Sequence, residues 1–146
     1  MTSPPHFVLS SLLVASGGAL GAWLRLVTGR LWTLAIGPVA ANQFPFATLT
    51  ANVLGSLCMG VLVGWLARHG ADSGQWGGGQ WGGEHWRLLL GVGVLGGYTT
   101  FSSFALEFAQ LVQRGNLGMA AFYVGISLAA GFAALFAGLY LMRSMA

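Results

Sequence analysis

Gly96 to Phe104 read Gly-Gly-Tyr-Thr-Thr-Phe-Ser-Ser-Phe, in the middle of an apolar segment long enough to cross a membrane. Two glycines, each about 1 kcal/mol worse than alanine in a helix interior, and two adjacent β-branched threonines make this run a poor helix former. In hydrocarbon, irregular backbone is tolerated only where protein, water or an ion satisfies its polar groups. The run therefore predicts a helix that is broken near residues 96–99, with a binding site or a pathway beside the break.

The composition indicates an integral membrane protein with an all-α fold. Of the 146 residues, 55% are hydrophobic and only 6% are charged, against roughly 25% charged residues in a soluble domain. A spanning helix needs about 20 predominantly apolar residues. Four such segments can be drawn, at about 7–27, 46–67, 86–112 and 117–142. They place residues 1–146 in a single transmembrane domain, with a glycine- and tryptophan-rich loop at 68–85.

The six arginines are shared equally between the two sides of the predicted membrane domain. With both termini and the middle loop on one side, that side holds Arg68, Arg87 and Arg143, and the other holds Arg25, Arg30 and Arg114. Because Lys and Arg asymmetry sets orientation in the membrane, the absence of a bias predicts insertion both ways round. Six scattered cations also make no stripe that could follow a nucleic-acid backbone.

Small residues recur at four-residue spacing in each segment, as in Gly17 and Gly21 or Gly60 and Gly64. Helix backbones approach closely along such faces. We expect a homodimer, and dual insertion would make its two copies antiparallel. The alternative is that these faces pack the four helices of one subunit against each other.

The second segment carries Thr48, Asn52, Gly55 and Met59 on one helical face. A primary amide in hydrocarbon is costly unless it is paired, and the two donors of Asn52 suit an anion or a carbonyl group. The alternative role for Asn52 is a hydrogen bond that joins two helices.

After the predicted break, Phe101, Phe104 and Phe108 form one stripe of the third segment, beside Thr100, Ser103 and Glu107. An aromatic ring has a positive edge, so phenyl edges suit a small dehydrated anion. The alternative is ordinary core or lipid contact. Glu107 is the sole acid within the segments, and it is close enough to the aqueous edge to extend toward water.

Further polar groups extend this pattern to other helices. Tyr123 and Ser127 are one turn apart in the fourth segment, and a track of hydroxyls would pass a partly hydrated ion from donor to donor. Tyr123 has an alternative role as an interfacial anchor. Arg25, at the end of the first segment, would draw anions into an aqueous vestibule, unless it extends to lipid headgroups.

The break also suggests a cation site. Unwound backbone releases carbonyl oxygens, which coordinate hard monovalent cations in membrane proteins with discontinuous helices. Two subunits would supply twice as many of these oxygens. We therefore expect a buried structural cation at the dimer axis.

Three motifs in order resemble those of the Fluc fluoride channels, also called the CrcB family. They are GGALGAWLR at 17–25, TLTANVLGS at 48–56 and GGYTTFSSF at 96–104, and the resemblance covers all four segments. It implies a passive fluoride channel, built as an antiparallel dual-topology homodimer with two pores and a central Na⁺. Leu26, Ala51, Leu57 and Ser103 depart from common family residues but remove no proposed ligand.

The same resemblance assigns roles to matching residues. Gly96 and Thr99 would give backbone carbonyls to Na⁺, Phe101 and Phe104 would form an aromatic fluoride box, and Asn52 would donate to the ion. The remaining assignments are pore-lining or pore-mouth positions for Thr48, Ser103, Glu107, Tyr123 and Ser127, and a vestibule position for Arg25. Gly131 stands where another hydroxyl is common in the family.

We therefore predict a multi-pass protein of the bacterial inner membrane, not an enzyme, that exports fluoride from the cytoplasm and so relieves fluoride toxicity. The residues by themselves indicate a small anion, and fluoride comes from the resemblance. One rival is a dual-topology proton-coupled small multidrug exporter, which would need a mid-membrane carboxylate that the first segment lacks. The other rival is a non-transporting membrane scaffold, in which the polar groups would only join helices.

Overall fold

The computed structural model describes residues 5–71 and 83–144, and in that part of the chain four helical spans are long and apolar enough to cross a membrane. The first two are α1 (Pro5–Gln43) and α2 (Phe46–Ala71), and the last is α6 (Leu117–Ser144). The third span comprises α3 (Gly83–Trp86), the π-helical η1 (Arg87–Leu95), α4 (Gly96–Tyr98) and α5 (Phe101–Gln113). The predicted all-α fold with four transmembrane segments is confirmed.

The predicted end of the first segment near residue 27 is wrong, because α1 continues to Gln43. Thr28 and Gly29, which suggested a helix end, lie inside the helix, and the apolar run from Leu31 to Ile36 extends it. The bend comes later, at Gly37, whose φ of 79° is open to glycine but strained for other residues. Pro38 follows and starts the short last section with a fixed φ.

The middle loop is also shorter than predicted at both ends. Residues 68–71 continue α2, and residues 83–85 already belong to α3. The rest of the predicted loop, residues 72–82, lies outside the described part of the chain.

Glycines bring helix backbones together within this one chain. A Cβ on Gly21 would collide with the Val94 carbonyl oxygen, and a Cβ on Gly60 with the Leu135 carbonyl oxygen. The alternative given for the small-residue faces, packing inside one subunit, is therefore what the structure shows for these pairs of helices. These glycines consequently give no argument for a dimer.

The third span is interrupted, as predicted, but the break lies at Thr99 and Thr100, at the end of the predicted range 96–99. Gly96 and Gly97 are helical, while Thr99 (φ −79°, ψ 156°) and Thr100 (φ −154°, ψ 120°) are extended. Gly97 serves close packing instead, since a Cβ there would lie 2.5 Å from the Gly18 carbonyl oxygen. The two threonines, rather than the two glycines, form the break.

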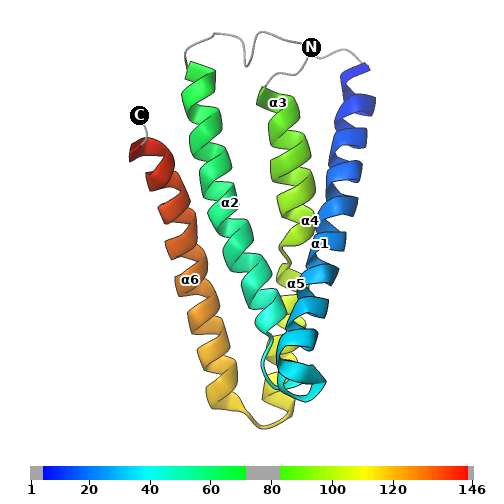
Figure 1. The fold of residues 1–146 in the computed structure, drawn as a ribbon, viewed down its shortest axis with the longest axis vertical. Helices are drawn as coiled ribbons and strands as arrows, with labels where there is room; N and C mark the ends of the chain where they lie inside the picture. Colours follow the sequence, from blue (N-terminus) through cyan, green and yellow to red (C-terminus); the bar gives the residue numbers. More distant parts are fainter. Residues whose placement is uncertain (1–4, 72–82, 145–146) are drawn as a thin grey trace.

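Figure 1 shows the spans as one bundle in which α2 and α6 run in the same direction, and the break lies between α4 and α5 beside α1 and α2. The start of α1, the end of α2, the start of α3 and the end of α6 lie at one end of the bundle, as the predicted topology requires. At the other end a small core forms around Phe44, Leu111 and the fully buried Tyr123. Many large apolar side chains elsewhere, such as Leu34 and Phe136, face outward, as expected for lipid contact.

Candidate functional site

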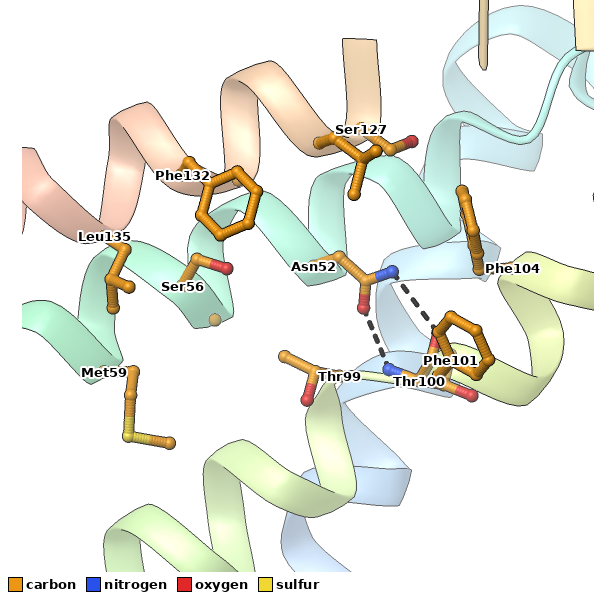
Figure 2. Close-up of a pocket in the computed structure, with 13 residues that line it drawn as sticks. Asn52, Ser56, Met59, Thr99, Thr100, Phe101, Phe104, Ser127, Phe132 and Leu135 are labelled. Carbon is orange, nitrogen blue, oxygen red and sulfur yellow. Dashed lines mark hydrogen bonds between the residues drawn. The ribbon is translucent and has the colours of Figure 1, made fainter. Parts of the chain in front are cut away.

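The side-chain amide of Asn52 joins α2 to the broken backbone of the third span. Its Oδ1 accepts from the Thr100 N–H at 2.8 Å, and its Nδ2 donates to the Thr100 carbonyl at 3.3 Å. Figure 2 shows both bonds. The alternative role predicted for Asn52, a hydrogen bond between helices, is confirmed, and one hydrogen of the amide group remains for another acceptor.

The break leaves carbonyls near it without their helical donors, and those of Gly96 and Thr99 are among them. In an unbroken helix the N–H of residue i bonds the carbonyl of residue i−4. The Thr100 N–H goes to Asn52 instead of Gly96, and the Ser103 N–H goes to Thr100 Oγ1, at 3.3 Å, instead of Thr99. Thr100 thus caps α5, and the donors that would have bonded the Gly96 and Thr99 carbonyls are committed elsewhere.

A groove of about 390 Å³ lies between α2, the break and α6. Asn52, Phe101, Phe104 and Ser127, all predicted to contact an anion, line it together with Thr99. Figure 2 shows these side chains around one space. The close approach of α2 to Thr99 depends on Gly55, because a Cβ there would collide with the Thr99 methyl group. Phe108, the third member of the predicted stripe, is not among the lining residues of this groove.

Phe101 and Phe104 of the groove lining pack against each other, and Phe104 packs in turn against Tyr123. The centroids of Phe101 and Phe104 are 5.9 Å apart, and those of Phe104 and Tyr123 are 5.1 Å apart, in tilted arrangements. Phe101 is 79% exposed, so one side of the groove is open in the single chain.

Glu107 is partly buried and is hydrogen-bonded by two other helices. Its Oε1 accepts from Thr48 Oγ1 at 2.6 Å, and its Oε2 accepts from Tyr123 Oη at 2.7 Å. Thr48 is 6% exposed and Tyr123 is fully buried. The alternative role of Tyr123 as an interfacial anchor is therefore wrong, because its hydroxyl lies inside the bundle, hydrogen-bonded to an acid.

A second, more polar pocket of about 620 Å³ lies toward the end of the bundle where α1 meets α2. Arg25, Thr48, Ser103 and Glu107, all predicted pore or vestibule residues, line it, and Arg30 joins them. Two arginines in one pocket attract anions. The extension of α1 past the predicted end carries Arg30 into this vestibule.

The polar residues of α2 and α6 form successive levels because these helices run in parallel. Thr48 and Tyr123 meet at Glu107, and one turn on, Asn52 and Ser127 line the groove. Thr48 in the vestibule lining and Asn52 in the groove lining are thus one turn apart on α2.

Sequence reasoning missed several contacts of this site. Ser56 lines the groove, although its four-residue spacing from Asn52 could have identified it. The bond of 3.1 Å between the Tyr98 and Thr28 hydroxyls, which ties α4 to α1 just before the break, has no local sequence signal. Gly96 lies beside the break but lines neither of the two pockets described here.

These features define a multi-pass helical membrane protein with a broken span and a polar, aromatic-lined groove. A sequence model described as "CrcB-like protein, Camphor Resistance (CrcB)" matches residues 12–139. The chain therefore belongs to the CrcB family.

Curated relatives of high similarity cover nearly the whole chain. A relative from Novosphingobium aromaticivorans is 53% identical over 94% of this chain and 98% of its own length, and is named "Fluoride-specific ion channel FluC". Relatives from Erythrobacter litoralis (46% identical, covering 99% of this chain and 98% of the relative) and Caulobacter vibrioides (44%, 92% and 95%) carry the same name. The chain is thus a multi-pass bacterial membrane protein of a family that includes fluoride channels.

Proposed function

We propose that the chain is a passive, fluoride-selective channel that lets fluoride leave the cytoplasm. One observation carries the proposal: an arginine-bearing vestibule lies one helical turn along α2 from a groove with phenyl rings and a buried Ser127 hydroxyl that has no partner among the described residues. Phenyl edges and hydroxyl donors suit a small, poorly polarisable anion, and they offer no cation that would hold it too tightly for release. The names of the relatives support fluoride as that anion.

Each site residue has a role in this proposal. Arg25 draws the anion into the vestibule, and Thr48, Ser103, Glu107 and Tyr123 line the way from the vestibule to the groove. In the groove, Phe101 and Phe104 present ring edges, Asn52 donates its remaining amide hydrogen, and Ser127 donates its hydroxyl.

We further propose that the freed carbonyls of Gly96 and Thr99 bind Na⁺. Carbonyl oxygen is a hard, neutral ligand that suits a monovalent cation, and the redirected N–H groups of Thr100 and Ser103 support the fit. When bound, the ion would fix the break. Two carbonyls are too few for a cation in a dry site, so we propose that a second chain provides the others.

We also propose that the protein forms an antiparallel homodimer, because a single chain leaves its groove uncovered. The groove is open on the side where Phe101 is 79% exposed. Polar groups such as Ser56 and Thr99 line it, and hydrocarbon would solvate them poorly. A second copy would cover this face, and the balanced arginines support insertion in both orientations.

No energy source is part of the proposal. A negative cell interior drives a monovalent anion outward by about 2.3 kcal/mol per 100 mV. Outward flow would keep cytoplasmic fluoride low and so relieve its toxicity.

The test is fluoride efflux from liposomes that contain the purified protein, followed with a fluoride electrode. We expect rapid, electrogenic fluoride release with chloride retained, and slower release from Phe101→Ile and Phe104→Ile. Phe136→Ile is the matched control, because Phe136 is 63% exposed on α6 and is absent from the lining of both pockets. Proton-dependent drug uptake without fluoride release would favour the exporter, and no transport of either kind would favour the scaffold.

A further inference from the structure

The groove has five polar lining residues, which are Asn52, Ser56, Thr99, Thr100 and Ser127. Three of them, Asn52, Thr99 and Thr100, are hydrogen-bonded in ways that hold the break. Asn52 bonds the Thr100 backbone. Thr99 Oγ1 donates to the Leu95 carbonyl at 2.9 Å, and Thr100 Oγ1 caps α5. The hydroxyls that are not used in this way belong to Ser127 and Ser56.

Ser56 lies one level beyond Asn52 and Ser127. It follows Asn52 by four residues, so both occupy the same face of α2. On α6 the corresponding position, one turn after Ser127, is Gly131, which has no side chain. A Cβ built on Gly131 would lie 3.8 Å from Ser56 Oγ, with no closer neighbour. At this level the α2 hydroxyl therefore borders the space that an α6 side chain would enter.

We propose that Ser56 is the next ion-contacting hydroxyl after Ser127, so that the polar track crosses from α6 to α2 at the level of Gly131. The inference rests on the proposed function, because it requires an anion to pass along the groove. A hydroxyl at either helix position would meet an ion at this level, which makes the two positions interchangeable. Beyond it the groove is lined by the apolar Met59 and Leu135, so among the described residues Ser56 is the last hydroxyl at this end of the groove lining.

The experiment compares fluoride efflux from liposomes with wild-type protein, Ser56→Ala and the double variant Ser56→Ala/Gly131→Ser. Loss of one hydrogen bond to the ion should slow Ser56→Ala by roughly three- to tenfold. The double variant should recover most of the rate, because a serine at 131 enters free space and restores a hydroxyl at this level. Cys58→Ala is the control, since Cys58 is exposed on the same helix and is absent from the groove lining.

The outcomes separate this inference from the proposed function. Fluoride release by the wild type with an unchanged rate in Ser56→Ala would overturn the role of Ser56 alone. Slow release from Ser56→Ala that Gly131→Ser does not restore would also overturn it, and a lowered melting temperature of Ser56→Ala would then assign Ser56 to packing. If the wild type releases no fluoride, both proposals fail.

Discussion

At the residue scale, Asn52 is the side chain on which the site most depends. It substitutes for helix hydrogen bonds at the break, since one oxygen and one nitrogen satisfy the N–H and the carbonyl of Thr100. A backbone break inside hydrocarbon is stable only if such a partner exists. Asn52 therefore has a structural role that is independent of any contact with an ion.

We predict that Asn52→Ala destabilises the protein by about 1–3 kcal/mol, because it leaves the Thr100 N–H and carbonyl without their partner. Thermal unfolding in detergent measures the change. Asn42→Ala is the control, as the Asn42 side chain is exposed and its backbone carbonyl still accepts from Arg114. Equal melting temperatures for Asn52→Ala and wild type would contradict the bridging role.

Tyr123 is fully buried, and its hydroxyl donates a hydrogen bond to Glu107. We predict that Tyr123→Phe lowers the free energy of unfolding by about 1–3 kcal/mol, since Glu107 loses one of its two hydroxyl donors. Tyr140→Phe makes the same chemical change at a side chain that is 73% exposed, and should change stability little. Both are measured by thermal unfolding, and similar effects in the two variants would rule out a special role for the buried hydroxyl.

At the element scale, the glycines set how closely α1 and the third span approach. Gly21 contacts the backbone of η1 and α4, and Gly97 contacts the backbone around Gly18. Close approach makes α1 a rigid support for the residues that precede the break. The bond between the Thr28 and Tyr98 hydroxyls adds a fixed point there.

We predict that Gly21→Ala destabilises the bundle, because its Cβ would meet the Val94 carbonyl oxygen and force the two helices apart. An overpacked site typically costs about 1–3 kcal/mol. Gly18→Ala is the matched control on the same helix, since a Cβ at Gly18 meets nothing within 4 Å. The two are compared by melting temperature, and a loss in Gly18→Ala as large as in Gly21→Ala would refute the packing explanation.

At the scale of the whole molecule, the groove of a single chain is open on one side. The six arginines are shared equally between the two sides of the predicted membrane domain. A partner that covers the groove must present a matching face, and a second copy in the opposite orientation would supply one. Closed two-fold symmetry is also the commonest arrangement of homo-oligomers.

We predict that the protein inserts in both orientations. Reporters fused after residue 146, one active only in the cytoplasm and one only outside it, should both give signal from the wild-type fusion. Added arginines at one end of the bundle should abolish one of the two signals. A wild-type C-terminus found on one face only would rule out the antiparallel dimer.

Local patterns predicted much of the candidate site. The spacing of Asn52, Phe101, Phe104 and Ser127 identified residues that the fold does bring to one groove. Prediction was weaker where partners are distant in sequence. Glu107 is an example, because no local pattern shows that Thr48 and Tyr123, on two other helices, both donate hydrogen bonds to it.

The sequence by itself determined the four apolar spans, the break in the third and the polar faces, because each follows from composition and spacing within one helix. Tertiary structure decided that the break falls at Thr99 and Thr100, that glycines pack α1 and α2 against neighbours in the same chain, and that Asn52 closes the break. These outcomes depend on which helices lie side by side. A residue's partner across a bundle is set by the packing of whole helices, which no local pattern contains.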